Sequence, residues 1–329
     1  MIPRLNIVFP IKRQLQYWFG ALYEPADGEF LLNHARSGIV MALRAALPNG
    51  GRVGVVGYNC HTVANAVVNG GCTPVFVDVT DILKIDIDTV PQDLDAIVVT
   101  NLFGIRNDIA TIRKLLPKAI IIVDNAHGFG LPVEGDFAVY SINQGKFPSL
   151  GEGGILYAIE DWRLRIENLY AALPSYSFMA QVKLFIQMWI KSVAYSRCVY
   201  RLTMNMKKSA NPDVHHEVVM KKMAPGVRRL YKAWLPNAKK EIEKQRRNAA
   251  QIDDAFYGDN AFMAIVKCEN PIALQEQYAK RGVETATHFK NAIVWAKQFG
   301  YIEGTCPNAE SLVNHLIMIP TYCKINRTI

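Results

Sequence analysis

The amino-acid sequence predicts an α/β protein in which helices cover both faces of a mainly parallel β-sheet. Short apolar runs, typical of strands buried on both faces, alternate along the chain with helical segments. The runs end in turns that contain glycine or polar residues. The chain has 329 residues, of which 50% are hydrophobic and 20% charged, so it can bury a large core. We expect an N-terminal arm (1–32), a large domain (33–229) and a small α+β C-terminal domain (230–329).

The arm and the first helix of the large domain come first along the chain. The arm contains Gln14–Tyr23, whose aromatic and leucine side chains have helical spacing, and we expect it to pack on the body or on a second subunit. Its basic and aromatic residues leave contact with a membrane surface open. Ser37 and Gly38 then precede an alanine-rich helix, so Ser37 is the expected N-cap. Free N–H groups at such a helix start suit a phosphate, although many helices begin this way and bind nothing.

Five apolar runs are expected to form strands of the large domain, with helices between them. The helices are predicted over Val63–Val68 and Ile109–Leu116. Neither a Gly-x-Gly-x-x-Gly motif after the first strand nor a Walker-type Gly-Lys-Ser/Thr motif is present, which disfavours dinucleotide-binding and P-loop domains. The five runs are Val53–Val56, Pro74–Val79, Ala96–Thr100, Ile120–Val123 and Phe137–Ile142.

A carboxylate and a lysine follow the last two of these runs. Asp124 stands at the end of Ile120–Val123, and Lys146 follows Phe137–Ile142, just before a glycine cluster (151–154). Ligands of open α/β sheets bind at the carboxyl ends of the strands. Pyridoxal phosphate requires a lysine amine for its Schiff base and an acid that keeps its pyridine nitrogen protonated. The pair therefore predicts a pyridoxal-phosphate site, although either residue alone is more often a solvated side chain or a turn cap.

Charge and cysteine content narrow the class of protein without choosing the function. The net charge of +8 favours an anionic partner, which leaves phosphorylated metabolites, nucleic acid and acidic membrane open. No helix-turn-helix signature or aromatic-basic stacking platform supports nucleic acid. The six cysteines are scattered and form no Cys-x-x-Cys pair, and no signal peptide is evident, which predicts a reduced, cytoplasmic protein. No spacing typical of a metal site is found, so we expect none.

The motifs taken in order resemble those of the DegT-type sugar aminotransferases, which are fold type I pyridoxal-phosphate enzymes. The resemblance extends over residues 33–157 and resumes weakly in 247–322. It implies a seven-stranded, mainly parallel sheet with helices on both faces. The motifs that carry it are Ser-Gly, Tyr-x-Cys, PVFVDV, Phe-Gly, VDNAHGFG, GDFAVYS and Lys-x-x-x-x-GEGG.

The resemblance also implies roles for individual residues. Lys146 corresponds to the lysine that bonds the cofactor and later carries a proton, and Asp124 to the partner of the pyridine nitrogen. His127 takes the position that contacts the phenolic oxygen of the ring. The cofactor phosphate is expected to bind Ser141, together with Ser37, Gly38 and the amide of Ile39.

The aromatic residue that stacks on the ring in this family falls in the region Tyr58–Cys60. Tyr58 is the available aromatic, but the position could equally fall on Cys60 or His61. Candidate substrate contacts are His288, Asn143 and Asn101.

The chain also departs from the family pattern. Asn143 replaces a histidine that is common three residues before the lysine, the segment before Arg36 is short, and the asparagine that reaches the partner subunit's phosphate is not identifiable near 221–229. These departures concern the substrate more than the cofactor. Lys146 is present, which disfavours the branch of the family that replaces it with histidine and dehydrates its substrate.

The function predicted from the resemblance is transamination by a homodimer. The amino donor is an amino acid, with L-glutamate as the first candidate, and the acceptor is a nucleotide-linked keto sugar. Such a reaction belongs to surface-polysaccharide or amino-sugar biosynthesis. Two alternatives remain at this stage. One is another pyridoxal-phosphate reaction, such as an elimination on an amino acid, and the other is a non-catalytic binding protein that retains the fold.

The second half of the chain begins with two helical segments and ends in the small domain. Trp162–Leu173 is charged, whereas Tyr176–Leu202 is strongly apolar but contains lysine and arginine. The apolar segment is interpreted as a buried or subunit-interface helix, with a position on a membrane surface as the less favoured alternative. The small domain is predicted to contain helices at Leu230–Tyr257 and Ile272–Arg281, strands at Ala261–Val266 and Val283–Phe289, and a closing segment at Ser311–Ile319.

Overall fold

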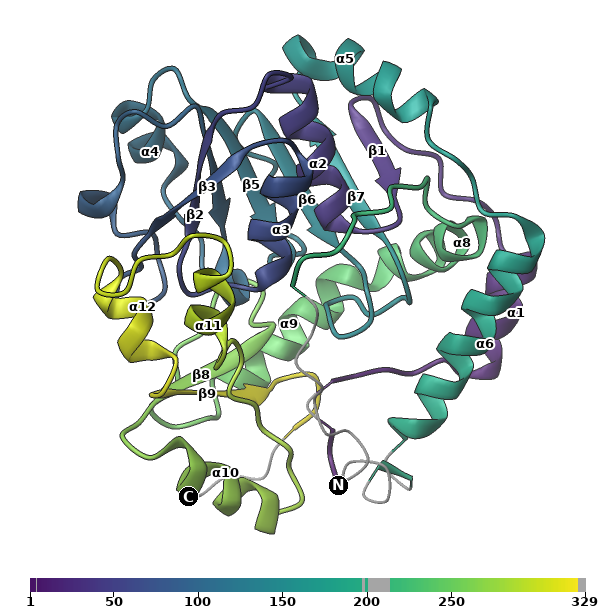
Figure 1. Cartoon of the computed structure of the whole chain (residues 1–329). Helices are drawn as coiled ribbons and strands as arrows, with labels where there is room; N and C mark the ends of the chain where they lie inside the picture. Colours follow the sequence, from purple (N-terminus) through teal and green to yellow (C-terminus); the bar gives the residue numbers. More distant parts are fainter. Residues whose placement is uncertain (4, 197–198, 201–213, 325–329) are drawn as a thin grey trace.

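The computed structural model describes residues 1–3, 5–196, 199–200 and 214–324 and is built around one large β-sheet (Figure 1). Within the described residues this sheet has seven strands in the order β1-β7-β6-β5-β4-β2-β3. Strands β2 to β6 are parallel, whereas β7 runs antiparallel to both β6 and β1. The strands are β1 (Glu29–Leu32), β2 (Arg52–Val56), β3 (Thr73–Val77), β4 (Ala96–Thr100), β5 (Ile120–Asn125), β6 (Phe137–Ser141) and β7 (Gly154–Ala158).

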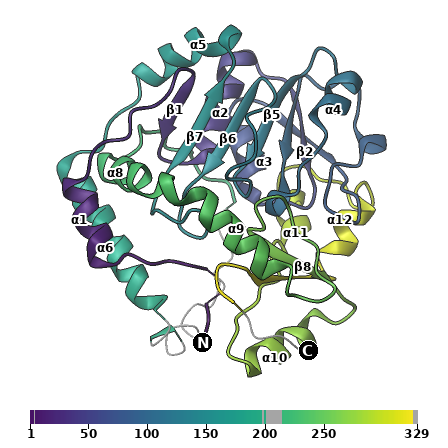
Figure 2. The same cartoon turned by 180° about the vertical axis from the view of Figure 1, so that it is seen from behind.

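Both faces of the large sheet are buried. Along β5, Ile122 packs into one hydrophobic cluster, and its neighbours Ile121 and Val123 pack into another on the opposite face. The cluster around Ile122 is covered by α2 (Ala35–Ala46), α3 (His61–Asn69) and α5 (Glu160–Ala171), and the other by α4 (Ile109–Leu115) and α8 (Pro225–Trp234). Figure 2 shows α8 and α9 (Ala238–Ala249) on the face opposite α2 and α3. The predicted fold class is therefore confirmed.

The last third of the described chain forms a second, smaller sheet. Strands β8 (Met263–Lys267) and β9 (Leu316–Pro320) pair antiparallel. The helices α10 (Pro271–Lys280), α11 (Ala292–Lys297) and α12 (Pro307–Leu312) flank this sheet or pack against the large one. Short 3-10 helices lie at Ile87–Thr89, Leu102–Gly104 and Leu235–Asn237.

Three local predictions along the chain are wrong. The long helix predicted over Leu230–Tyr257 is divided between α8 and α9, because Pro236 lies in the 3-10 turn that separates them. Val283–Phe289 is not a strand and makes only isolated bridges to Ile2 and Met318. Ser37 is not the N-cap of α2, because the helix begins at Ala35 after the extended residue His34.

The helices α1 (Ile11–Phe19) and α6 (Phe178–Ala194) lie side by side at one edge of the molecule. Within the apolar segment predicted over Tyr176–Leu202, α6 ends at Ala194, and some of the later residues lie outside the described part of the chain. Leu184 and Met188 are the buried residues of α6, so this helix is not buried within the single chain. Its interpretation as a subunit-interface helix stays a prediction. None of the described helices is long and apolar enough to cross a membrane.

Candidate active site

A cavity of about 190 Å³ lies at the carboxyl ends of the central parallel strands. Thr100 at the end of β4 pairs in register with Asp124 of β5, and Ser141 ends β6, so three polar side chains meet at one edge of the sheet. The wall is completed by residues from the starts of α2 and α3, by the turn that carries Lys146, and by Phe289. A larger hollow of about 640 Å³ lies elsewhere, but its Arg106 and Glu134 are partly exposed and neutralise each other.

Lys146 reaches this cavity from a tight turn after β6. The turn is made possible by Gly145, whose φ of +87° would strain any other residue, and the N–H of Lys146 donates to the carbonyl of Asn143 at 3.0 Å. Burial lowers the pKa of the Lys146 amine, and the nearby Cys60 and Asp124 oppose this shift. An amine of lowered pKa is available as a nucleophile nearer to neutral pH.

His127 lies against the amine of Lys146, with 2.7 Å between its Nε2 and Nζ. The backbone N–H of Phe103 donates to Nδ1 of His127 at 3.2 Å, so a neutral imidazole carries its proton on Nε2. Burial, followed by the positive charge that Lys146 carries whenever its amine is protonated, holds the pKa of His127 well below its usual range. The contact is therefore a hydrogen bond from a neutral imidazole to an unprotonated lysine amine, consistent with the lowered pKa values of both groups.

Three phenylalanine rings and one strained backbone position hold His127 in place. Phe103 stacks on the imidazole at 5.0 Å between ring centroids, and Phe262 and Phe289 lie 5.1 and 5.9 Å away. Phe103 has a φ of +52°, which is rare for a residue other than glycine. This left-handed conformation occurs at the residue whose N–H sets the His127 tautomer.

Asp124 is buried beneath the same cavity. One carboxylate oxygen accepts the N–H of Ala126 at 2.9 Å, and the other accepts the hydroxyl of Thr100 at 3.5 Å. The hydroxyl of Thr100 in turn accepts from the side-chain amide of Asn59 at 2.9 Å. Burial raises the pKa of the Asp124 carboxyl, and the Ala126 N–H, Lys146 and Thr100 act in the opposite direction. A buried carboxylate of this kind is stabilised by a cation bound above it.

The start of α2 forms one end of the cavity, where the predicted Ile39 and Ser141 are present but the predicted Ser37 and Gly38 are not. Ala35, Arg36 and Ile39 line the cavity together with Ser141. Ser37 is fully buried and its hydroxyl donates to Asn33 at 2.9 Å, so the structure does not bring it to the cavity. Gly38 lies against the sheet, where a Cβ would stand 2.9 Å from Cγ1 of Val139.

This end of the cavity fits an anionic group such as a phosphate. The first turn of a helix presents backbone N–H groups that have no partner within the helix. The Nε atom of Arg36 is buried and has no hydrogen-bond partner among the described residues. An unpaired guanidinium nitrogen and a helix N-terminus beside Ser141 together provide charge and donors for the phosphate of a cofactor.

Of the three candidates for the residue that faces the ring, the structure brings only Cys60 to the cavity. Tyr58 is fully buried, and its hydroxyl donates to the carbonyl of His288 at 2.7 Å. His61 packs against Trp295, with 4.9 Å between the ring centroids. Burial acts to raise the pKa of the Cys60 thiol, but hydrogen bonds from His61 and Thr62 and the charge of Lys146 lower it to about 7.

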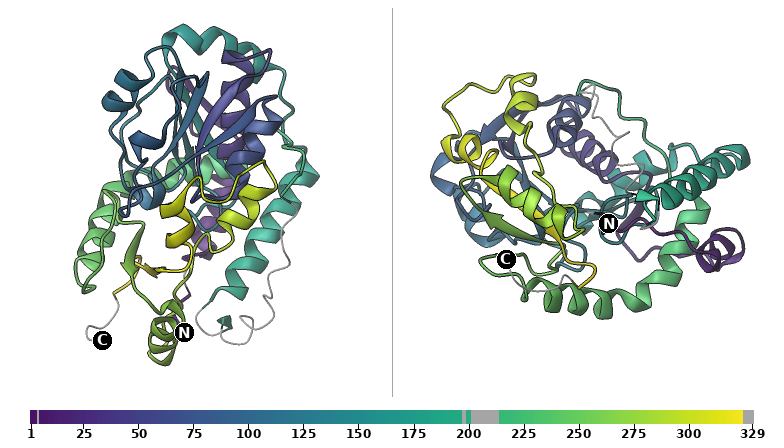
Figure 3. Two further views of the ribbon diagram at one scale, coloured as in Figure 1. Left: turned by 60° about the vertical axis from the view of Figure 1, so that its left-hand side comes forward. Right: turned by 90° about the horizontal axis from the view of Figure 1, so that it is seen from below.

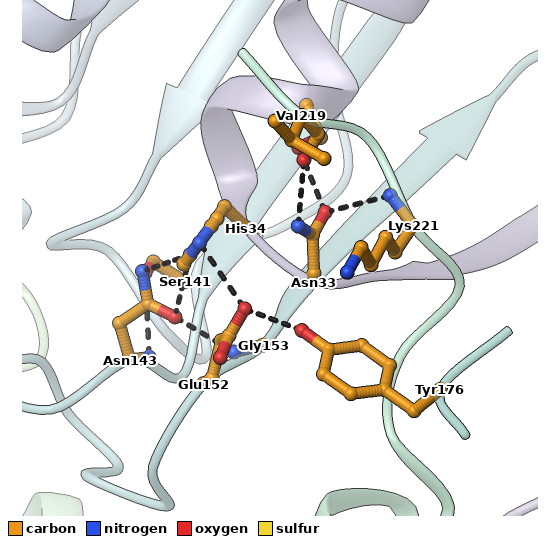
Figure 4. A network of polar contacts seen from close by, with 10 residues as sticks. Asn33, His34, Ser141, Asn143, Glu152, Gly153, Tyr176, Val219 and Lys221 are labelled. Carbon is orange, nitrogen blue, oxygen red and sulfur yellow. Dashed lines mark hydrogen bonds and ion pairs between the residues drawn. The ribbon is translucent and has the colours of Figure 1, made fainter. Parts of the chain in front are cut away.

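Asn143 lines the cavity and belongs to a polar network behind it (Figure 4). Its amide nitrogen lies 3.0 Å from Nδ1 of His34, and its oxygen accepts the N–H of Gly153 at 2.7 Å. Nε2 of His34 lies 3.2 Å from Glu152, which also accepts from the hydroxyl of Tyr176 at 2.5 Å. Burial, with the charge of Arg36, lowers the pKa of His34 to about 4, so near neutral pH the uncharged His34 donates a hydrogen bond to Glu152.

The remaining predicted substrate contacts lie outside the cavity wall. Asn101 is buried in the core, where its amide donates to Asn125 at 2.7 Å and its oxygen accepts the N–H of Asn107. The ring of His288 lies beside Phe103 and His127 at 5.8 and 6.4 Å between centroids, and its neighbour Phe289 lines the cavity instead.

Several residues of the site were missed by sequence reasoning. Thr100 and Asn59 carried a usable signal, because each is a polar residue near the carboxyl end of a predicted strand. Phe103 belonged to the Phe-Gly motif but was assigned no role in the site. Phe289 carried no signal, because an isolated phenylalanine is usually a core residue. Arg36 was adjacent to the predicted phosphate site but was assigned no role. In the described residues no group of histidine, cysteine and acidic side chains is arranged to hold a metal ion.

Residues 31–172, which contain these strands and the lysine turn, match the sequence profile of the DegT/DnrJ/EryC1/StrS aminotransferase family. This segment belongs to that family. The match confirms the predicted family, and with it an aminotransferase and the pyridoxal-phosphate cofactor such enzymes use. No curated protein sequence matches the chain significantly.

Solved structures of sugar aminotransferases have the same fold as this aminotransferase. CalS13 from Micromonospora echinospora superposes with a TM-score of 0.72 at 17% identity, covering 98% of this chain and 95% of that one. The putative sugar aminotransferase Spr1654 from Streptococcus pneumoniae, in its PMP form, gives a TM-score of 0.72 at 15% identity over 98% and 94% of the two chains. DesI gives 0.70 at 18% identity over 98% and 87%. At these identities the similarity establishes the fold.

Proposed function

We propose that the chain is a pyridoxal-phosphate-dependent aminotransferase that moves an amino group from an amino acid to a nucleotide-linked keto sugar. L-glutamate is the first candidate for the amino donor. The observation that carries the proposal is the 2.7 Å contact between Nζ of Lys146 and Nε2 of His127, in a cavity that also contains the buried side chain of Asp124. The function of the family of residues 31–172 agrees with it. We propose the cytoplasm as its compartment, and surface-polysaccharide or amino-sugar biosynthesis as its pathway.

Each end of the cavity has a distinct task in this proposal. When bound, pyridoxal phosphate supplies an electron sink for a carbanion at the substrate carbon. Asp124 would keep the pyridine nitrogen protonated, and the positive charge of that nitrogen would favour the ionised form of the Asp124 carboxyl. Arg36, the first N–H groups of α2 and Ser141 hold the phosphate, and Cys60 faces the ring. With the cofactor in the cavity, the Nε2–H of His127 would contact the phenolic oxygen of the ring in place of the free lysine amine.

Lys146 is the proposed attachment point and proton carrier. Its lowered pKa leaves the amine able to attack a carbonyl and, once released, to accept a proton from the substrate carbon. His127 donates to that amine through Nε2 and so directs its lone pair. Three aromatic rings hold the imidazole of His127 in place, so its position relative to the Lys146 amine is fixed.

The sugar substrate and the assembly rest on the resemblance and on relatives. DesI was solved in the presence of its TDP-sugar product, and a nucleotide-linked sugar of that class is our proposed acceptor. We further propose a homodimer, with an arm (1–32), a large domain (33–229) and a small domain (230–329). The substrate would enter between the two sheets, where Phe289 and Asn143 line the cavity.

The proposal is tested by visible absorbance of the protein titrated with pyridoxal phosphate, for wild type and Lys146→Ala, with and without L-glutamate. We expect a visible band of lysine-bound cofactor in the wild type that bleaches with glutamate and is missing in the variant. Lys84→Ala, which changes an exposed lysine remote from the cavity, is the matched control.

The outcomes separate the alternatives. If the band does not respond to glutamate and the protein forms product from an amino acid without a keto acceptor, an elimination or lyase reaction would replace transamination. Absence of a band in the wild type would refute the cofactor site itself. If glutamate bleaches the band, keto-sugar nucleotides would then be screened as amino acceptors by mass spectrometry.

A further inference from the structure

The helices α1 and α6 form a two-helix edge that stands away from the sheets (Figures 1 and 3). Their facing sides are well packed. The hydroxyl of Tyr17 donates to the carbonyl of Gln181 at 3.0 Å, and the Tyr17 and Trp18 rings each lie 5.4 Å from that of Phe185. The pair is therefore a fixed part of the molecule whose inner side is held by protein.

The opposite side of both helices is apolar and exposed. In α1, Ile11, Leu15 and Phe19 recur every four residues and so share one face, and Phe19 is 82% exposed. In α6 the exposed apolar residues recur at helical spacing, and Trp189 is 48% exposed. We call this surface the outer face. It comprises Ile11, Leu15, Phe19, Met179, Ile186, Trp189, Ile190 and Val193.

An apolar face of this kind requires a partner. Single exposed apolar residues are ordinary, but a contiguous set on two packed helices marks an interaction surface. A helix that is apolar on nearly all sides is normally buried, yet α6 buries only Leu184 and Met188 within the described structure.

The charges on the two helices identify the chemistry of that partner. Neither α1 nor α6 contains an aspartate or a glutamate. Their charged residues are all basic, namely Lys12, Arg13, Lys183 and Lys191. Lys12, Lys183 and Lys191 are exposed, so cations border an apolar, aromatic face.

We propose that the outer face lies in the surface of an anionic lipid bilayer. Aromatic and aliphatic side chains would enter the acyl boundary, and the lysines would contact acidic headgroups. The helices would lie in the plane of the surface, because their inner sides are occupied by the protein core. A symmetric contact between two copies of this face would bring the same cations together with no acid in either helix, so a second copy is a poorer occupant.

The test is flotation of the full-length protein with vesicles of neutral phosphatidylcholine or of phosphatidylcholine with phosphatidylglycerol. The first variant is Ile186→Gln with Ile190→Gln, two exposed changes that leave the inner side of α6 intact. Its control is Leu164→Gln with Ile302→Gln, which removes two apolar side chains elsewhere that are even more exposed. The expected result is flotation of wild type and control with anionic vesicles only, and its loss in the α6 variant.

A charge variant tests the electrostatic part of the proposal. Lys183→Gln with Lys191→Gln should weaken binding to anionic vesicles by about fivefold for each lysine. Lys232→Gln with Lys239→Gln makes the same change in net charge on exposed sites away from the face and should bind as the wild type does. High salt should weaken wild-type binding because it screens exposed charges.

Other outcomes would overturn the proposal. Failure of the wild type to float with anionic vesicles refutes it. If light scattering shows a wild-type dimer that the Ile186→Gln, Ile190→Gln variant converts to monomer, and vesicles bind neither, the outer face is an interface between copies instead. Cofactor absorbance and circular dichroism establish that each variant is folded, and both are independent of lipid binding.

Discussion

At the scale of single residues, hydrogen-bond donors and burial determine the state of the site. The N–H of Phe103 assigns the tautomer of His127, and that tautomer requires an unprotonated Lys146 as its partner. The same logic applies to Arg36, whose buried Nε atom has no partner among the described residues. A buried donor left unpaired costs free energy, so an anion bound at this place would be stabilised.

Arg36 is expected to bind the phosphate of the cofactor. Arg36→Gln should weaken binding of pyridoxal phosphate by roughly 10- to 150-fold, because a hydrogen bond to a charged group contributes about 1.5–3 kcal/mol. Affinity for pyridoxal, which lacks the phosphate, should stay the same. Absorbance titration with both compounds measures the difference, and Arg44→Gln, on the same helix but outside the cavity, is the control. Equal losses for the two compounds would contradict the assignment.

At the scale of elements, the position of α2 determines the shape of the phosphate end. Gly38 allows α2 to approach β6 and β7 so closely that a Cβ would stand 2.9 Å from Val139 and 3.3 Å from Leu156. The start of the helix is linked to the lysine turn through His34, Asn143 and Glu152 (Figure 4). Packing and polar contacts thus hold the helix N-terminus against the cavity.

Gly38→Ala should destabilise the protein although alanine is the better helix former. Overpacking against the sheet costs about 1–3 kcal/mol, which exceeds the gain of about 1 kcal/mol from helix propensity. Urea unfolding measures the free energy of unfolding. Val139→Ala in the same chain should recover part of the loss, since it removes the methyl groups that the new Cβ meets. Increased stability of the single variant would show that α2 can move away freely.

His34 should make stability sensitive to acid. Its pKa is about 4 in the folded protein, below the 6.5 of an unfolded chain, so the unfolded state binds more protons between these values. The free energy of unfolding should therefore fall by up to about 3 kcal/mol as the pH falls from 7 to 4. His34→Asn places a favoured N-cap residue at this position and removes this titration. The difference in the free energy of unfolding between the two proteins should therefore shrink or reverse at low pH. Parallel pH profiles would exclude the effect.

At the scale of the whole molecule, the cavity is built from parts far apart in the sequence. Residues from the starts of α2 and α3, the ends of β4 to β6 and Phe289 meet around it. The rings around His127 include Phe262, next to the small sheet, and Phe103, beside the large one. A ligand bound in this cavity would therefore be held by segments that belong to both sheets.

Pyridoxal phosphate should raise the thermal stability of the whole chain. At a concentration 100 times its Kd, a ligand specific for the folded state contributes about 2.7 kcal/mol. We expect the Tm to rise by about 5 °C, measured by differential scanning calorimetry. Lys146→Ala and Arg36→Gln should each show a smaller rise, and Arg44→Gln the full one. An equal rise in all variants would place the binding site elsewhere.

The sequence by itself determined the fold class and the central pair of the site. Alternating apolar runs and helices predict a parallel sheet, and the carboxyl ends of such strands share one edge, so Asp124 and Lys146 were expected to lie together. The tertiary structure decided which residues of α2 and α3 face the cavity. One residue along a helix turns its side chain by about 100°, so the packing of Gly38 against Val139 brings Arg36 to the cavity and turns Ser37 away. Contacts between distant segments, such as Phe103 with His127 and α1 with α6, depend on packing that no local pattern encodes.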